Sequence, residues 1–282
     1  MRNVIVFLFI FCLAVPCFAV TVGGPSDMET PEASLFLKNQ AVRNALDMYE
    51  YNLNWKGSAE VEVVLDRKLK SVDPDTSNAE MEGRGAIFKL STSYYNVIEP
   101  YFKIGSSQYK IKWKQHDNDV TIDTEPGIVW GAGIKTKLWE FADQGVKLTL
   151  DLQYRNTDLS VEAAELNGSG DIAAADNKKF EIQEWQWALL ASKKLILPLG
   201  QNDVYMIPYA GATYSIIDVD AQFIQSDTGG HIYSTYNTSD RNPYGLVLGF
   251  DMMPSLTSWY LWTVELRLVN ETAFTIGGTA RF

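Results

Sequence analysis

Apolar and polar residues alternate along much of this chain, and the alternation is clearest at its C-terminal end. From Glu271 to Phe282 the sequence reads ETAFTIGGTARF. One face of this segment carries Phe274, Ile276, Gly278, Ala280 and Phe282, while the other carries small or polar residues. A repeat of two residues is the side-chain period of a β-strand, so the segment is predicted to be a strand with one apolar face.

The same alternation predicts ten strands along the chain. They cover 58–70, 83–96, 101–114, 126–139, 146–160, 180–196, 203–220, 242–252, 259–268 and 271–282. Many exceed the ~5–6 residues of an ordinary globular strand and match the ~9–11 residues that a tilted membrane strand needs. Short connections near 97–100, 140–145, 197–202 and 252–258 alternate with longer polar ones near 71–82, 115–125, 161–179 and 221–241. This rhythm and an even strand count favour an all-β fold, an antiparallel up-and-down transmembrane barrel.

The aromatic residues give an independent indication of a membrane. Near the end with short turns we expect Tyr94, Phe102, Trp139, Phe250, Tyr260, Trp262 and Phe282. Near the other end we expect Trp130, Tyr154, Trp185, Tyr214, Tyr244 and Phe274. Aliphatic residues lie between the two sets, and two aromatic girdles around an aliphatic band are typical of a barrel in lipid.

Residues 1–19 read as an export signal. Arg2 precedes an apolar core from Val4 to Val15, and the stretch closes on Cys17-Phe18-Ala19, which predicts cleavage after Ala19. Two alternatives are less favoured. A lipoprotein acylated at Cys17 is one, because Pro16 precedes the cysteine. A retained transmembrane helix is the other, because the apolar stretch is shorter than the ~20 residues that a membrane span needs. Both cysteines, Cys12 and Cys17, lie in this segment, so no disulfide or thiol chemistry is expected after cleavage.

Residues 20–57 form a separate N-terminal segment before the predicted barrel at 58–282. Thr30 and Pro31 resemble a helix start, and a broken apolar stripe follows, which predicts a short amphipathic helix over 32–48. Such a helix would lie at the periplasmic mouth or plug the lumen. Two alternatives stay open: a flexible leader, and a strand at 46–56 that lengthens the first strand of the barrel.

These features together resemble bacterial outer-membrane β-barrel proteins, in particular small barrels of about eight to twelve strands. The resemblance covers 58–282, and its most specific element is the terminal FTIGGTARF. It implies a bacterial outer-membrane location, with membrane lipid and lipopolysaccharide as partners. It also implies that Phe282 belongs to the signal read by the barrel assembly machinery.

The charge of the chain excludes one class of partner. Arg2 is the one charged residue of the predicted signal, so its removal changes the formal net charge from −11 to −12. Nucleic acid is therefore not expected, because phosphate binding needs clustered Lys and Arg. Acidic residues are frequent in the long connections, but the full twelve-residue calcium-loop pattern is absent, and we predict neither a metal nor another cofactor.

Charged residues on the inward faces are the candidate functional set. Those expected to face the lumen are Glu60, Glu62, Lys89, Lys103, Lys135, Lys137, Lys147, Asp151, Arg155, Glu184, Asp251, Glu265, Arg267 and Arg281. They either pair across a filled interior or line a pathway for small solutes. Glycines at 105, 131, 133, 211, 249 and 277 are expected to leave space along the wall.

The functional hypothesis is a non-enzymatic barrel with a structural or interaction role. One alternative is a narrow, porin-like diffusion channel. Another is a hydrolase at the outer rim, similar to the omptins, which use acidic residues with an Asp-His pair. His116 and His231 are the two histidines, and His116 directly precedes Asp117, but no second acidic pair is evident at matching spacing. No catalytic residue is therefore predicted.

The terminal phenylalanine generates a testable prediction. Deleting Phe282 should lower the amount of folded barrel while leaving export intact, because the deletion shortens the predicted assembly signal. The measurement is outer-membrane fractionation combined with the faster gel mobility of unheated, folded barrel. The intact chain is the control, and normal assembly of the deletion would contradict this role.

Overall fold

The computed structural model of the chain describes residues 53–70, 76–115, 118–166, 169–171, 179–199, 202–227, 230–255 and 258–281. The predicted signal peptide, the helix expected at 32–48 and Phe282 lie outside these ranges. The strands are β1 (Leu53–Lys68), β2 (Thr76–Tyr94), β3 (Ile98–Gln115), β4 (Asn118–Thr124), β5 (Gly127–Phe141), β6 (Val146–Leu159), β7 (Val161–Leu166), β8 (Ser169–Asp171), β9 (Lys179–Lys193), β10 (Leu195–Leu199), β11 (Asn202–Asp227), β12 (Gly230–Ser239), β13 (Tyr244–Met253), β14 (Tyr260–Leu268) and β15 (Glu271–Arg281).

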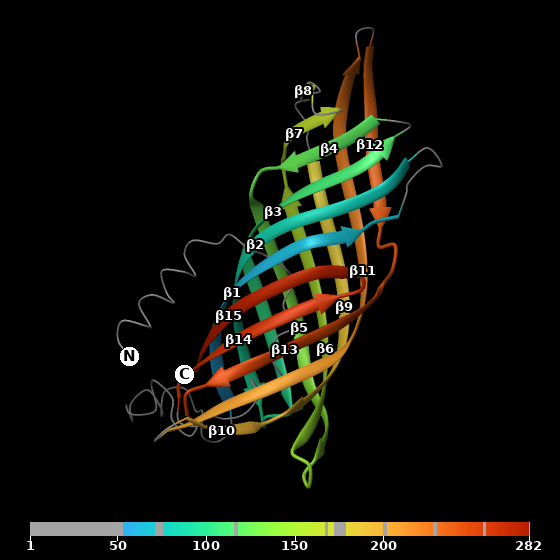
Figure 1. Cartoon of the computed structure of the whole chain (residues 1–282). Coiled ribbons are helices and arrows are strands. Elements are labelled where there is room, and N and C mark those ends of the chain that lie inside the picture. Colours follow the sequence, from blue (N-terminus) through green and yellow to red (C-terminus); the bar gives the residue numbers. More distant parts are fainter. Residues whose placement is uncertain are drawn as a thin grey trace, which may run out of the picture.

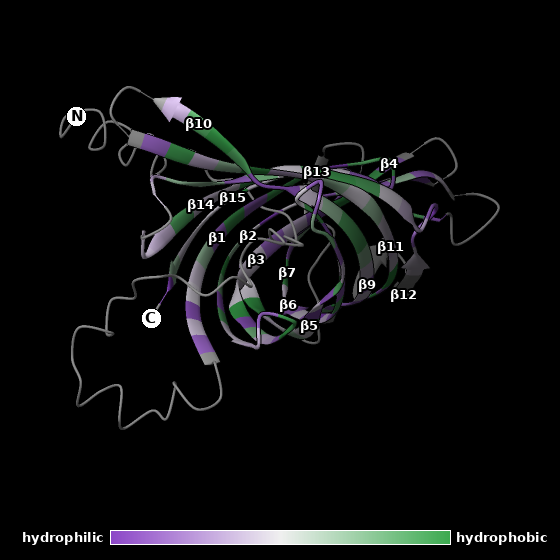
Figure 2. Ribbon diagram, turned by 90° about the horizontal axis from the view of Figure 1, so that it is seen from below, coloured by the Kyte–Doolittle hydropathy of each residue, from purple (hydrophilic) through white to green (hydrophobic). Residues whose placement is uncertain are grey.

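Ten of these strands form a closed antiparallel barrel, as the sequence predicted. Its wall follows the chain through β1, β2, β3, β5, β6, β9, β11, β13, β14 and β15, and β15 pairs with β1 to close the ring. Figures 1 and 2 show this closed wall from the side and from below. β1 begins at Leu53, so the last residues of segment 20–57, from Leu53 to Gly57, extend the first strand of the barrel.

The long connections are more ordered than their polarity indicated. β4 pairs with β3 and β7, β8 pairs with β7, and β12 pairs with the far half of β11. Figure 1 shows these strands gathered at one end of the barrel, which we call the outer extension. Apolar residues continue the alternation there, including Val120 and Ile122 in β4, and hairpin pairing satisfies backbone groups that a bare edge would expose.

Outward-facing side chains form the expected aliphatic band and aromatic girdles. Leu90, Ile104, Ile134, Leu189 and Leu248 are each at least 40% exposed. On the outer side, neighbouring rings make a continuous row with centroid distances of 4.8–6.4 Å. This row contains Trp130, Tyr154, Trp185, Trp187, Tyr214 and Tyr244, of which the sequence analysis missed Trp187.

In the part of the chain that the structure describes, no helix is long and apolar enough to cross a membrane.

The two faces of β6 give a prediction about depth. Leu150 faces outward and pairs with Leu189 of β9, whereas Asp151 is 1% exposed inside the barrel. Leu150→Arg should lower the free energy of unfolding by roughly 2–4 kcal/mol, because it places a cation near the middle of the lipid band. The measurement is denaturant unfolding of the refolded barrel in lipid vesicles.

Asp158→Arg is the matched control for this variant. It lies on the same outward face of β6, beyond the aromatic row, and its side chain is exposed. Its cost should be at most about 1 kcal/mol, since depth-dependent costs vanish near the interface. Equal costs for the two variants would contradict the assigned depth or register.

Candidate functional site

The interior of the barrel is the candidate site, because buried charged residues gather there. The side chain of Arg67 on β1 contacts that of Glu184 on β9, although the two strands lie on different sides of the wall. A contact of this kind has to cross the interior. The inward residues divide into successive layers along the barrel, described here from the end with short turns.

The first layer contains an ion pair that is fully enclosed. The ammonium group of Lys56 donates to the carboxylate of Glu99 at 2.6 Å, and both side chains are 0% exposed. Lys135 is also fully buried. Lys56 and Glu99 lie just outside the predicted strand limits and were therefore not predicted to face the lumen, although both continue the alternation of their strands.

The second layer combines carboxylates, lysines and a tyrosine. Glu60 lies 3.3 Å from Lys89 and 3.7 Å from Lys103. The hydroxyl of Tyr101 donates to Asp151 at 2.7 Å, and both lysine ammonium groups lie over the Tyr101 ring, 5.8 and 5.4 Å from its centroid. Cations over an aromatic face are attracted by its quadrupole, so Tyr101 links the two lysines to Asp151.

Two glycines that were expected to leave space instead receive tyrosine rings. A Cβ atom built at Gly133 would lie 2.3 Å from Cζ of Tyr101, and one built at Gly249 would lie 2.3 Å from Cζ of Tyr209. Tyr209 in turn donates to Glu265 at 3.0 Å. The missing side chains therefore seat inward tyrosines against the wall, and the expectation that these two glycines leave space there was wrong.

The third layer, here called the Arg67 cluster, centres on one guanidinium. Arg67 binds both oxygens of Asp240 at 2.8 and 2.7 Å, and it donates to Glu184 at 2.7 Å and to Ser215 at 2.7 Å. Glu271 approaches it at 3.3 Å. Four segments that are distant in sequence thus meet at one side chain.

Two further arginines extend the Arg67 cluster. Arg155 donates to Glu184 at 2.6 Å and to Glu62 at 3.1 Å. Arg267 lies 3.1 Å from Glu271. All of these side chains are at most 6% exposed. Burying charges is costly unless each is paired, so these pairs are needed to keep the charged forms inside the barrel.

The fourth layer is apolar and lies within the outer extension. It is a continuous buried cluster contributed by β1, β2, β3, β4, β6, β7, β9, β11 and β15 and by Leu69. Its members are Val64, Leu69, Ala79, Met81, Tyr109, Ile111, Trp113, Val120, Ile122, Leu159, Val161, Ala164, Phe180, Ile182, Ile217, Val219, Ala221 and Ala273. We call this layer the apolar cap. No such layer was predicted from the sequence, and some of its residues, including Val120, Ile122 and Val161, lie in connections that were expected to be polar.

The remaining predicted lumen residues occupy the inner rim or the wall near it. Lys147 lies 3.9 Å from Glu140, and Lys137 lies 2.8 Å from the same carboxylate, with both lysines partly exposed. Thr263 donates to Asp251 at 2.6 Å. Arg281 is buried, with one guanidinium nitrogen 3.0 Å from the sulfur of Met253.

Arg67 and Asp240 are the cluster members that sequence reasoning could least have found. Simple alternation after Glu62 and Val64 places Asp66 inside, but a β-bulge after Val64 shifts the register and turns Arg67 inward. Asp240 follows β12 in a connection with no period of its own.

Possible metal ligands and the two histidines are the other groups that could carry chemistry. No group of three or more His, Cys, Asp or Glu side chains in those ranges could hold a metal ion. His116 lies outside the described residues, and the side chain of His231 is not described either. The omptin-like hypothesis therefore stays a prediction.

Comparison with solved structures finds other barrels at low similarity. The translocator domain of the autotransporter NalP from Neisseria meningitidis matches with 12% identity over 87% of this chain and 94% of that one, at a TM-score of 0.40. The outer membrane protease OmpT from Escherichia coli matches with 9% identity over 82% and 96%, at 0.47. An outer membrane channel from Pseudomonas putida F1 matches with 11% identity over 81% and 95%, at 0.30. No family model and no curated protein matches the chain.

The fold itself is decided by the geometry of the wall. Ten antiparallel strands close on themselves around a charged interior, with an aliphatic band and aromatic girdles outside. The chain therefore folds as a closed, ten-stranded antiparallel β-barrel with the outward surface typical of barrels in an outer membrane. Because the identities and TM-scores of these solved structures are low, they give no information about the activity of this chain. The barrel interior is therefore the basis for its function.

The Arg67 cluster generates a prediction about stability. Arg67→Met should lower the free energy of unfolding of this barrel by about 3–5 kcal/mol, because it leaves buried carboxylates without their cation. The measurement is denaturant unfolding in vesicles. Lys114→Met is the control, since the Lys114–Asp119 pair is more than half exposed and such pairs contribute about 0–1 kcal/mol. A cost for Arg67→Met as small as that of the control would contradict the importance of the cluster.

Proposed function

We propose that this protein is an integral barrel of the bacterial outer membrane that neither catalyses a reaction nor conducts solutes, and that it has a structural or interaction role. The apolar cap is the observation that carries this proposal. Its residues come from seven of the ten wall strands and from β4 and β7, and they pack into one buried cluster. A hydrophobic constriction resists water and ions, since it offers them no hydrogen-bond partner.

The charged layers alone would not carry the same conclusion. Some buried polar atoms there have no hydrogen-bond partner among the described residues, including Oε2 of Glu62, Oδ2 of Asp151 and Nε of Arg155. Buried polar groups of this kind are ordinarily bonded to internal water. The charged layers are therefore compatible with a wet interior, and closure of the pathway depends on the apolar cap.

The orientation follows from the lengths of the connections. Outer-membrane barrels have short turns on the periplasmic side and longer connections outside. The outer extension, with β4, β7, β8 and β12, would then face the exterior, and the turns near 142–145 would face the periplasm. The aliphatic band and its aromatic girdles would contact membrane lipid, and the outer row would lie beside lipopolysaccharide.

The outward surface of the extension supports an interaction role. Lys110 pairs with Asp123 at 3.0 Å, Lys112 with Glu82 at 2.5 Å and Lys114 with Asp119 at 3.6 Å, all on the solvent-facing side of β2, β3 and β4. These side chains are partly or largely exposed. A folded, charged surface outside the membrane band is suited to contacts with other molecules rather than to lipid.

A narrow diffusion channel is the second candidate, and the charged layers favour it. Lys89, Lys103, Glu60 and Asp151 resemble the charged lining of a selective pore. For this role the apolar cap would have to open. The two candidates therefore differ in one measurable property, the ionic conductance of the intact barrel.

Conductance in planar bilayers tests the proposal. The intact chain, inserted after its outer-membrane origin has been checked by fractionation, should give no stable step conductance, because the apolar cap blocks the path. A sixteen-stranded porin inserted under the same conditions is the positive control. A stable, ion-selective conductance from the intact chain would contradict the proposal and favour the channel.

A deletion distinguishes closure of the barrel by the apolar cap from closure by the N-terminal segment. Removing residues 20–50 leaves β1 intact, since β1 begins at Leu53. If the apolar cap closes the barrel, the deletion variant should show no more conductance than the intact chain. Conductance that appears with this deletion would instead assign closure to the N-terminal segment and contradict the role of the cap.

A further inference from the structure

The inward side chains nearest the short turns are buried although they lie at an end of the barrel, which we call the inner mouth. Ser93 of β2 pairs with Asn54 of β1, one pair from the end of the ladder between these strands. Ser93, Lys56 and Glu99 are each 0% exposed. The hydroxyl oxygen of Ser93 and Oε1 of Glu99 have no hydrogen-bond partner among the described residues. Side chains at the rim of an open tube would contact bulk water, so this burial requires a cover.

The contacts in this half of the lumen follow the wall. Lys56 on β1 reaches Glu99 on β3, two strands away along the wall. Two other pairs span the same interval, Tyr101 with Asp151 and Tyr209 with Glu265. Arg67, by contrast, reaches Glu184 on β9, five strands away across the lumen. Contacts that follow the wall do not by themselves close the axis of the inner mouth, so they leave room there for an occupant.

The lining of the inner mouth has two sides of different chemistry, and Figure 2 looks along the barrel from this end. β11, β13 and β14 present a buried apolar cluster of Ile207, Met253 and Leu261, which we call the Ile207 cluster. β3 and β5 lie opposite in the strand order and present Glu99 and Lys135. All five side chains are at most 3% exposed. An occupant that fits this lining therefore has one apolar face and one polar face.

The N-terminal segment, residues 20–52, is the occupant that the chain itself supplies. It ends where β1 begins, at Leu53, and this end of β1 lies at the inner mouth. The sequence predicts an amphipathic helix over 32–48, with Leu46 in its apolar stripe. Leu46 precedes Leu53 by a distance of about 10 Å in a helix and at most about 25 Å in an extended chain. So short a tether gives the segment an effective concentration on the order of millimolar at the mouth, which favours it over a free partner.

The charge of the segment fits the same place. Residues 20–52 contain five acidic residues and two basic ones, a net charge of −3. At the rim of the inner mouth, Lys137 and Lys147 share the carboxylate of Glu140, at 2.8 and 3.9 Å. Opposite charges attract more strongly where the protein excludes part of the water. The acidic residues of the segment are therefore attracted to this rim.

We propose that residues 20–52 seal the inner mouth from within, with their apolar stripe against the Ile207 cluster and their polar face toward Glu99 and Lys135. This seal goes beyond the proposed function, which places closure in the apolar cap at the other end of the lumen, and it does not depend on the membrane role. Two seals isolate the charged layers between them. Internal water in those layers then exchanges only when one of the seals opens.

Thiol labelling of single-cysteine variants tests the seal, because both native cysteines lie in residues 1–19. The chain without residues 1–19 is refolded in detergent micelles and treated with a water-soluble maleimide. Ser93→Cys should react slowly in this chain. It should react at least about tenfold faster when residues 20–50 are also removed, because a buried thiol reacts only while its site is open.

Thr157→Cys is the matched control for this measurement. Thr157 is also 0% exposed, but it lies two residues beyond Arg155, toward the apolar cap. Its labelling should be slow in both chains, and unheated gel mobility confirms that each variant is folded. Equal labelling of Ser93→Cys in the two chains, slow or fast, would overturn the proposal, since residues 20–50 would then not be what covers Ser93.

Point variants keep the segment and test which of its faces forms the seal. Leu46→Asp places a charge in the apolar stripe and should speed the labelling of Ser93→Cys by about tenfold or more, the factor that burial of one leucine side chain contributes. Asn44→Asp adds the same charge on the opposite face of the predicted helix and should leave the rate unchanged. Equal effects of the two variants would contradict an apolar docking face.

A synthetic peptide of residues 20–50, added to the barrel that lacks them, identifies the occupant. At a concentration on the order of millimolar, which the tether provides in the intact chain, the peptide should restore slow labelling of Ser93→Cys. A peptide of the same composition in scrambled order should not. Protection by both peptides, or by neither, would overturn the assignment of this segment. None of these rates measures conductance, so failure of the inner seal leaves the role of the apolar cap to the bilayer experiment.

Discussion

Closure of the backbone hydrogen-bond ladder is the constraint on which the rest of this structure depends. In lipid, unpaired N–H and C=O groups have no water to satisfy them, so a sheet can span a membrane only as a closed barrel. The pairing of β15 with β1 meets this requirement, from Lys56 with Arg281 to Arg67 with Glu271. Once the wall is closed, the two-residue period sends every second side chain inward, where lipid cannot reach it.

The inward side chains are polar, and their confinement explains the layers. A narrow interior keeps bulk water away from Lys56, Glu99 and Glu184, so each charge needs a partner from another strand. Such pairs hold together strands that are distant in sequence. Arg67 alone contacts Glu184, Asp240 and Glu271, which are separated from it by 117, 173 and 204 positions in the sequence. The outer extension rises beyond the lipid, and there the interior changes from paired charges to the apolar cap.

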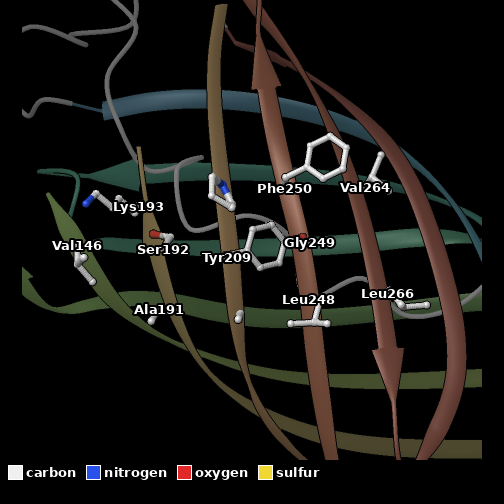
Figure 3. A pocket seen from close by; sticks show the side chains of 12 residues that line it. Val146, Ala191, Ser192, Lys193, Tyr209, Leu248, Gly249, Phe250, Val264 and Leu266 are labelled. Atoms are coloured by element: carbon white, nitrogen blue, oxygen red, sulfur yellow. The ribbon is translucent and has the colours of Figure 1, made fainter. Parts of the chain in front are cut away.

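The outward side of the wall has two surfaces of different chemistry. Beyond the aromatic row the outward residues are charged and paired with one another, whereas between the girdles they are apolar. An outward-facing groove beside Ala191 and Ala210 (Figure 3) is an exception within the second region, because these two small side chains are paired with each other.

The sequence by itself determined the features that repeat every two residues. Ten strands, the outward face of Leu150 and the inward face of Asp151 are readable because alternation is a local property of a strand. Tertiary structure decided the rest. A single bulge reversed the faces of Asp66 and Arg67, and Tyr101 occupied the space that Gly133 was expected to leave open. The connections expected to be polar loops became β4, β7, β8 and β12. The pairings of β4 with β3, β8 with β7 and β12 with β11 are local hairpins. Val120 and Ile122 of β4 and Val161 and Ala164 of β7 are nevertheless buried in the apolar cap, which forms only when strands from distant parts of the chain meet.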